Sequence, residues 1–307
     1  MSLVLEFLLT FALSIWYWIV GIFKAVVPQK FLKQKNVKGQ VVLVTGAGSG
    51  LGRLISLRFA CLGCKLVLWD IDENGNRETY NQVKAITSEV KAYKVDLSKR
   101  EDIYETAVQV KSDIGDVDIL VNNAGIVTGK KFLECPDVLI EKTMAVNSNA
   151  HFWTTKSFLP SMLSRNHGHI VSIASSAGLF GVSGLCDYSA SKFAAVGFDE
   201  SLRNELQKQK KTGVKTTVVC PFYINTGMFT GVKSRFPSLL PLLDADHVVD
   251  RIITAVLTNQ EMLLIPRSIY LFYLLKGLVP VKVVEVLSNF FSVHDSMDDF
   301  VGRSKQN

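Results

Sequence analysis

Continuous apolar runs alternate along the chain with longer mixed segments of helical length. The runs at residues 41–44, 65–69 and 117–121 contain few polar positions. Strands of a parallel sheet are covered on both faces, so they lack the polar alternation of half-exposed strands. The pattern predicts an α/β fold, a doubly wound parallel sheet of seven strands with helices on both faces. The expected strands are 41–44, 65–69, 90–95, 117–121, 169–174, 214–219 and 262–265, and the expected helices are 51–62, 73–87, 98–110, 138–164, 187–207 and 246–258.

An apolar segment near the N-terminus is long enough to cross a membrane. Residues 3–23 carry one charge, Glu6, and as a helix they would be about 31 Å long, enough for a hydrocarbon core. The positive-inside rule then places the main domain in the cytosol, with the short N-terminus across the membrane. The basic flank that supports this orientation consists of Lys24, Lys30, Lys33, Lys35 and Lys38.

Other interpretations of this segment are weighed against a spanning anchor. A cleaved signal peptide is disfavoured, because no basic region precedes the apolar run and no small-x-small cleavage site follows it. A hairpin or an in-plane insertion stays open, and Trp16, Tyr17 and Trp18 suit a membrane interface. An in-plane segment would also allow the protein to sit on a lipid-droplet monolayer, which no spanning helix can do.

The C-terminal region contains a second apolar segment. Residues 268–275 are apolar and aromatic but too short to span a bilayer, and Pro280 interrupts the pattern. We expect Tyr270, Phe272 and Tyr273 to form a membrane-facing or substrate-entrance surface, with an interior-packed helix as the alternative. The polar tail from residue 292 onward is expected to be loosely packed.

Composition supports a membrane setting and a reducing compartment. Among the 307 residues, 48% are hydrophobic and the mean hydropathy is +0.23, which is high for a soluble enzyme. The net charge of +6 owes much to the lysines after the anchor, so it favours anionic lipid over nucleic acid. Five scattered cysteines fit a reducing compartment. Cys61-x-x-Cys64 has no second Cys/His pair nearby, so we interpret it as a helix end and expect no metal site.

A glycine-rich turn follows the first apolar run. In Thr45-Gly46-x-x-x-Gly50-x-Gly52, the glycines suit a tight turn, close approach of the backbone to a pyrophosphate and close packing of the next helix. That helix would direct its N-terminal N–H groups at the phosphates. The expected cofactor contacts in this loop are Gly46, Ser49, Gly50, Leu51 and Gly52.

The second expected strand ends in a carboxylate about 20 residues beyond the glycines, where a ribose 2′-hydroxyl is bound in dinucleotide folds. This residue is Asp70, and no basic residue beside it would accept a 2′-phosphate. The cofactor is therefore expected to be NAD rather than NADP, which favours oxidation in cells.

The spacing of these glycines, together with later motifs, resembles the short-chain dehydrogenase/reductase superfamily. The later motifs are Asn122-Asn123-Ala124-Gly125, Met144-Ala-Val-Asn147, Ser175 thirteen residues before Tyr188, and Tyr188-x-x-x-Lys192. The resemblance covers roughly residues 38–266. It divides the chain into a hydrophobic membrane anchor at 1–30, a dinucleotide-binding catalytic domain at 38–266, and a C-terminal apolar segment with a polar tail at 267–307.

The resemblance implies a role for each motif. Asp96 and Leu97 would lie against the adenine, although Asp96 could equally cap the next helix. Asn123, Ala124 and Gly125 would steady the central strand beside the cofactor. Thr226 would meet the nicotinamide carboxamide, although Phe222 stands where the superfamily usually has glycine. The expected catalytic residues are Asn147, Ser175, Tyr188 and Lys192.

The chemistry explains why these residue types are needed. Oxidation of an alcohol removes its hydroxyl proton, and a tyrosine of pKa about 10 is a poor base at neutral pH. Half ionisation of Tyr188 near pH 7 needs a pKa shift of about 3 units, or about 4 kcal/mol. Lys192 and the cationic nicotinamide would supply the charge. Ser175 would hydrogen-bond the substrate oxygen, Lys192 would hold the nicotinamide ribose, and Asn147 would position a water that links Lys192 to solvent.

Residues 227–243 are rich in Gly, Phe, Pro and Leu, and we interpret them as a flap over the substrate. Met228, Phe229 and Phe236 are expected to line an apolar pocket beneath it, with a packed loop without function as the alternative for each of them.

The anchor, the sequence Asn225-Thr-Gly-Met-Phe229 and the apolar C-terminal segment resemble one branch of the superfamily. That branch contains epidermal retinol dehydrogenases and lipid-droplet 17β-hydroxysteroid dehydrogenases. The resemblance implies oxidation of all-trans-retinol to all-trans-retinal at the endoplasmic reticulum membrane, with the catalytic domain facing the cytosol. The alternatives are a 17β-hydroxysteroid dehydrogenase on lipid droplets and a non-catalytic lipid-surface protein. The superfamily usually forms homo-oligomers through the helices after strands four and five.

Overall fold

The computed structural model describes residues 2–27 and 31–302. Lys30 of the basic flank lies outside these residues. The chain forms two compact units with a boundary between Asn36 and Val37.

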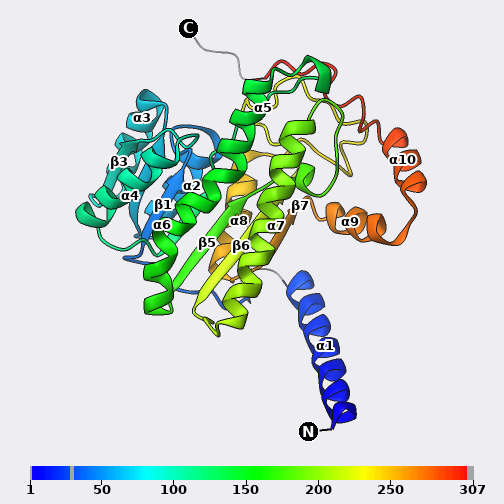
Figure 1. Ribbon diagram of the computed structural model, residues 1–307, viewed down its shortest axis with the longest axis horizontal. Helices are drawn as coiled ribbons and strands as arrows, with labels where there is room; N and C mark the ends of the chain where they lie inside the picture. Colours follow the sequence, from blue (N-terminus) through cyan, green and yellow to red (C-terminus); the bar gives the residue numbers. More distant parts are fainter. Residues whose placement is uncertain (1, 28–30, 303–307) are drawn as a thin grey trace. The chain divides into compact units, whose positions relative to one another are not determined.

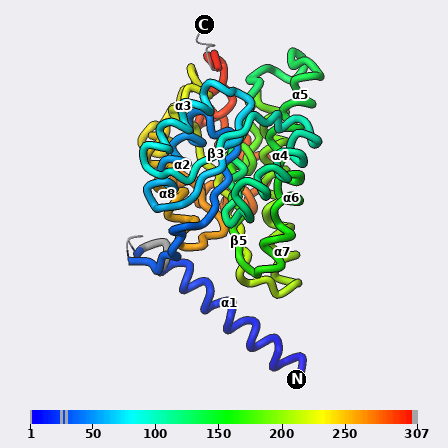
Figure 2. Tube along the Cα trace, turned by 90° about the vertical axis from the view of Figure 1, so that its left-hand side faces the viewer, coloured from blue at the N-terminus to red at the C-terminus, as the bar shows by residue number. Residues whose placement is uncertain are grey.

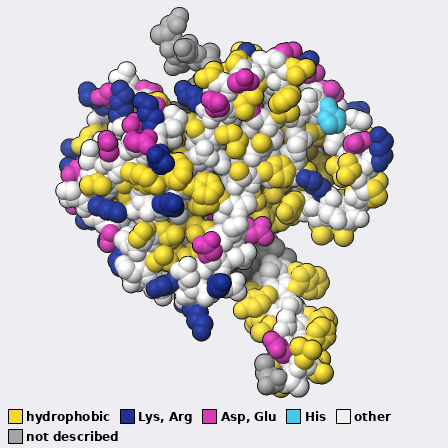
Figure 3. Space-filling view, in the orientation of Figure 1, with side chains coloured by type: hydrophobic (Ala, Val, Ile, Leu, Met, Phe, Trp, Pro, Cys, Tyr) yellow, Lys and Arg dark blue, Asp and Glu magenta, His cyan; other side chains and the backbone are white. Residues whose placement is uncertain are grey.

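The first unit contains one helix, α1 (Leu3–Val26). Its N-terminus is capped by Ser2, whose side chain accepts a hydrogen bond from the Leu5 N–H, and its only acidic residue in the first turn is Glu6. Between Leu3 and Phe23 the helix is long and apolar enough to cross a membrane. Figure 3 shows hydrophobic side chains along this helix and one acidic side chain near its end.

The second unit is built on a parallel sheet of seven strands in the order β3-β2-β1-β4-β5-β6-β7. The fold prediction is therefore confirmed. The order in which successive strands are added reverses between β1 and β4, although all strands stay parallel, and in such sheets this switch opens a crevice beyond the carboxyl ends of the strands. The strands are β1 (Val41–Thr45), β2 (Lys65–Asp70), β3 (Val90–Lys94), β4 (Ile119–Asn122), β5 (Gly168–Ile173), β6 (Val214–Pro221) and β7 (Met262–Ile265).

Helices cover both faces of the sheet, as Figure 2 shows with α2, α3 and α8 on one side and α4, α6 and α7 on the other. In β1, Val42 and Val44 join the core under the first group, while Leu43 joins the core under the second. Burial on both faces explains the unbroken apolar runs. These helices are α2 (Gly50–Cys61), α3 (Glu73–Lys84), α4 (Arg100–Asp113), α6 (Ala150–Arg165), α7 (Cys186–Lys208) and α8 (Ala245–Leu257).

The single helix expected over residues 138–164 is interrupted. The structure has α5 (Asp137–Met144), one π-helical turn η3 (Ala145–Asn149), and then α6. Asn147 lies inside this turn with its side chain fully buried. A π turn widens the helix by one residue and is common at functional sites. The polar residue that disfavours a regular helix therefore coincides with the irregularity.

The helix expected from residue 98 begins at Arg100, and its N-cap is Lys99. The interpretation of Asp96 as a helix cap is therefore wrong. Its carboxylate instead accepts hydrogen bonds from the backbone N–H and the hydroxyl of Ser98, in a local turn after β3.

Two short helices, α9 (Ser268–Leu278) and α10 (Val281–Phe290), follow β7 (Figure 1). The three aromatic residues of α9 do not share one environment. The Tyr270 ring is exposed, but its hydroxyl donates to the Met262 carbonyl and accepts from the Leu264 N–H on the edge strand. Tyr273 is exposed, whereas Phe272 packs edge-on against Phe291.

The tail is not loosely packed as far as the structure describes it. Residues 292–302 turn back over the sheet unit, and Ser296 and Met297 are only 9% and 7% exposed. The prediction of a loose tail fails here because two side chains find buried partners that the polar composition does not reveal.

Candidate functional site

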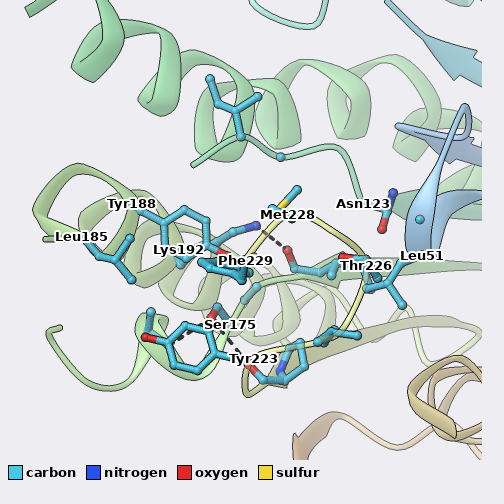
Figure 4. Close-up of a pocket in the computed structure, with 18 of the residues that line it drawn as sticks. Leu51, Asn123, Ser175, Leu185, Tyr188, Lys192, Tyr223, Thr226, Met228 and Phe229 are labelled. Carbon is cyan, nitrogen blue, oxygen red and sulfur yellow. Dashed lines mark hydrogen bonds between the residues drawn. The ribbon is translucent and has the colours of Figure 1, made fainter. Parts of the chain in front are cut away.

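A cavity of about 350 Å³ opens at the carboxyl ends of the strands, where the topology places a crevice. Figure 4 shows the side chains that converge in it. Most of the predicted site residues line this cavity: Gly46, Ser49, Gly50, Leu51, Asp70, Asp96, Leu97, Asn123, Ala124, Gly125, Ser175, Tyr188, Lys192 and Thr226. Gly52 and Asn147 are not part of its wall.

The glycine turn between β1 and α2 brings backbone into close contact with backbone. A Cβ on Gly52 would lie 2.0 Å from the Gly46 carbonyl oxygen, so only glycine fits there. Gly46 has φ +64°, and a Cβ on it would lie 2.8 Å from the Cα of Ala124. The N-cap of α2, Ser49, makes no side-chain hydrogen bond to the first turn. The N–H groups at this helix start are therefore left for an anion, which fits a dinucleotide pyrophosphate.

The turn after β4 is bonded to the glycine turn. The Asn123 side-chain amide donates to the carbonyls of Thr45 at 2.8 Å and Gly46 at 3.2 Å. The Thr45 hydroxyl accepts from the backbone N–H groups of Asn123 and Ala124. These bonds hold the ends of β1 and β4 together at the point where the strand order switches.

Asp70 ends β2 beside the same turn. Its carboxylate accepts hydrogen bonds from the Gly48 N–H at 2.7 Å and the Asp72 N–H at 2.9 Å. Burial raises its pKa, while these hydrogen bonds act in the opposite direction. Arg53 lies next to this turn, but its guanidinium is bonded to Glu78 and to the Gly48 carbonyl. The arrangement presents a fixed carboxylate, which suits a ribose hydroxyl better than a phosphate.

Ser175, Tyr188 and Lys192 lie together at the other end of the cavity (Figure 4). Tyr188 and Lys192 are four residues apart in α7 and therefore share one face. The Lys192 ammonium donates to the Ile173 carbonyl at 2.8 Å and lies 5.6 Å from the centre of the Tyr188 ring. The Ser175 hydroxyl accepts from the Ala177 N–H at 3.1 Å. All three side chains are buried.

Burial is the main cause of the pKa shifts of Tyr188 and Lys192. It raises the pKa of the Tyr188 phenol, and the nearby Ser175 hydroxyl acts in the opposite direction. It also lowers the pKa of Lys192 to about 8. The shift for Tyr188 is opposite to the one that a general base needs. Ionisation of this phenol therefore requires positive charge close to its oxygen.

Asn147 lies behind the wall, next to Lys192. Its amide oxygen accepts from the Ile126 N–H at 2.8 Å, and its amide nitrogen donates to the Ile126 carbonyl and to Ser191. A Cβ on Gly125 would lie 3.4 Å from the Asn147 oxygen and 3.5 Å from the Lys192 nitrogen. Both side chains therefore flank Gly125. The relay through a water stays a prediction.

The flap prediction is partly right. Met228 and Phe229 line the cavity, but Phe236 does not, because its ring stacks on Phe290 at 5.1 Å and meets Phe291 edge-on at 5.5 Å. Phe236 therefore packs against the end of α10 and is not part of the cavity wall.

Several cavity residues were missed by the sequence analysis. Tyr223 lines the cavity with its ring 5.2 Å from that of Phe229, and Phe222 packs on it at 4.6 Å. Two aromatic residues directly after a strand were the available signal. The C-terminal residues Phe291, Ser292, Val293 and Ser296 also line it, and no motif indicated them.

Cys61 and Cys64 occupy different environments. Cys61 is exposed, whereas Cys64 is buried, its pKa is raised to about 12 by burial, and its thiol contacts the Val37 carbonyl. Within residues 2–27 and 31–302, no group of three or more His, Cys, Asp or Glu side chains is arranged to hold a metal ion.

Comparison with known proteins gives consistent matches over most of the chain. A family model described as short chain dehydrogenase matches residues 40–235. Human epidermal retinol dehydrogenase 2 is 52% identical over 274 residues, covering 89% of each chain. Retinol dehydrogenase 10 from Xenopus tropicalis is 44% identical and covers 100% of this chain and 97% of its own.

Two solved structures of short-chain dehydrogenases or oxidoreductases share the fold of this chain. A short-chain dehydrogenase/reductase from Burkholderia phymatum in complex with NAD has a TM-score of 0.72 and 27% identity, covering 82% of this chain and 96% of its own. A metagenomic short-chain oxidoreductase in complex with NADP has a TM-score of 0.63 and 27% identity, covering 75% and 98%. The same fold therefore accommodates either cofactor.

Proposed function

The chain belongs to the short-chain dehydrogenase family, and from that premise we propose that it oxidises all-trans-retinol to all-trans-retinal with NAD. The observation that carries the proposal is the meeting of Ser175, Tyr188 and Lys192 at one end of a cavity whose walls there are largely apolar. The substrate is taken from the named activities of the relatives, which are retinol dehydrogenases.

The residues of the chain would orient the alcohol and remove its proton. When bound, the nicotinamide ring supplies the acceptor for the hydride that leaves the alcohol carbon. The Ser175 hydroxyl would hydrogen-bond the substrate oxygen, and Tyr188 would take the hydroxyl proton. Lys192 would favour the ionised phenol by its charge and hold the ribose, while Asn147 keeps the neighbouring loop in place.

The preference for NAD rests on Asp70. Its carboxylate would accept hydrogen bonds from the ribose hydroxyls, and it would repel a 2′-phosphate. The two hydrogen bonds from Gly48 and Asp72 prevent it from turning away.

We propose that α1 anchors the protein in the endoplasmic reticulum membrane, with the catalytic unit in the cytosol. An in-plane α1 would instead allow residence on lipid droplets. The apolar length of α1 supports anchoring, and α9 and α10 add a second apolar surface. Its exposed members are Tyr270, Leu271, Tyr273, Leu274, Leu278, Val281, Val283, Val286, Leu287 and Phe290.

The substrate is tested with membranes that contain the protein, supplied with NAD and either all-trans-retinol or a 17β-hydroxysteroid. We expect retinal to form from retinol, and a rate at least about 100-fold lower with Ser175→Ala, because a hydrogen bond to the reacting oxygen is lost. Oxidation of the steroid alone would replace retinol as the substrate. Oxidation of neither would favour a non-catalytic role.

The cofactor preference is tested with Asp70→Asn, which keeps the shape of the side chain and removes its charge. The ratio of NAD to NADP affinity should fall at least about tenfold, since a charged hydrogen bond contributes roughly 1.5–3 kcal/mol. Glu73→Gln is the matched control, because Glu73 is an exposed carboxylate at the start of α3. An unchanged ratio in Asp70→Asn would show that this carboxylate does not select the cofactor.

Anchoring is tested by alkaline extraction of membranes. The full chain should stay in the membrane pellet, and a chain without residues 1–30 should be released while still binding NAD, because the sheet unit is compact by itself. Release of the full chain by alkali would contradict a membrane-embedded α1.

A further inference from the structure

The C-terminal segment, residues 292–302, runs alongside the flap. Figure 1 shows this red segment leaving α10 and passing next to the yellow flap that follows β6. The Val301 N–H donates to the Thr230 carbonyl at 2.9 Å, and the Lys233 N–H donates to the Ser296 carbonyl at 3.4 Å. Lys233 and Asp299 also form an ion pair. Flap and C-terminal segment are therefore bonded together as one layer.

The Phe300 ring packs this layer against the loop that follows β4. It lies against Gly129 in this loop, where a Cβ would come within 2.0 Å of the ring. Gly129 has φ +65°, a conformation that side chains disfavour. The approach of the Asp299 carbonyl to Gly231 in the flap is equally close, because a Cβ there would lie 1.9 Å from its oxygen. The loops that contain Gly129 and Gly231 are far apart in the sequence, yet both leave room for the C-terminal segment.

The inner side of the C-terminal segment reaches the cavity. Ser292, Val293 and Ser296 line it, and the Ser296 hydroxyl shares a 3.2 Å hydrogen bond with the Tyr223 hydroxyl. Met297 is buried in one apolar cluster with Leu185, Tyr188 and Tyr223.

Aromatic ring contacts connect Phe300, through Phe229, to Tyr188 at the catalytic end of the cavity. The Phe300 ring lies 6.2 Å from Phe229, and the Phe229 ring lies 5.7 Å edge-on from Tyr188. Phe300 itself is not part of the cavity wall. A change at Phe300 therefore acts on the cavity by releasing the segment and Phe229, without removing a group that touches the reacting atoms.

We propose that residues 292–302 form the outer wall of the substrate end of the cavity and determine how tightly a lipophilic alcohol is held. The inference deepens the proposed oxidation of retinol and rests on it. The wall supplies apolar surface from Val293 and, through Phe229, from the flap. Residues from the glycine turn, Asp70 and Asp96 lie at the other end of the cavity, so the wall acts on the substrate and leaves the dinucleotide end unchanged.

The test measures binding of all-trans-retinol to the full chain in the presence of NADH, followed by quenching of protein fluorescence, together with KM and kcat for oxidation. Phe300→Ala should weaken retinol binding and raise KM by about tenfold or more, because the half-buried Phe300 ring packs against Phe229 and the cluster that contains Met297, and its loss releases both from the cavity. NADH affinity should change less than twofold, and kcat should change less than about threefold.

Matched variants distinguish a specific effect of the wall on retinol binding from a general loss of folding stability. Val301→Ala alters an exposed side chain in the same segment and should leave retinol binding unchanged. Gly129→Ala should weaken retinol binding as Phe300→Ala does, and should add little in the Phe300→Ala background, because the clash partner is gone. Gly115→Ala also places alanine at a positive φ, +103°, but with no heavy atom within 4 Å, so it should not affect retinol binding.

Unchanged retinol binding and KM in Phe300→Ala, with retinol still oxidised, would overturn the wall and leave the proposed function intact. If the wild type oxidises only a steroid alcohol, the proposed function fails, and the same variants test the wall with that steroid. If Phe300→Ala does not fold, Phe300→Leu gives the same comparison with a smaller expected change. Absence of any retinol or steroid binding by the wild type would overturn both.

Discussion

The hydrogen bond from the Lys192 ammonium to the Ile173 carbonyl fixes the geometry on which the site depends. A buried cation is costly unless it is hydrogen-bonded, and this one is only 3% exposed. The bond holds α7 against the end of β5, and Gly178 allows the contact, because a Cβ there would lie 2.6 Å from the Lys192 carbonyl oxygen. Tyr188 on α7 and Ser175 after β5 are thereby brought to one end of the cavity.

The same burial creates the chemical problem that the site must solve. Removing Tyr188 from water orients its ring but raises its pKa, and it brings the pKa of Lys192 down to about 8. The chain thus provides orientation and a water-poor environment, while ionisation of the phenol depends on positive charge next to its oxygen. Flap and C-terminal segment contribute to this environment, because Phe229 and Met297 pack beside the Tyr188 ring.

Much of this could be predicted from the sequence, for identifiable reasons. Burial on both faces produces continuous apolar runs, and backbone contact at Gly52 tolerates no side chain, so both leave clear patterns. Asn147 was recognisable as an unfavourable helix residue, but the π turn around it depends on bonds to Ile126, which is distant in sequence. The path of the C-terminal segment depends on Phe300 meeting Gly129, and β5, β6 and β7 lie between these two residues in the sequence. Long-range pairs of this kind leave no local pattern.

The central claim is that Tyr188 removes the proton of a membrane-dissolved alcohol during its oxidation. The most direct measurement is a single turnover of all-trans-retinol by NAD-saturated protein, comparing wild type with Tyr188→Phe after NAD affinity has been measured for both. The account predicts equal NAD affinity within about twofold and a rate lower by about 10²–10⁴ in the variant, the usual contribution of a positioned base. A variant that binds NAD normally and oxidises retinol at a rate close to wild type would contradict it.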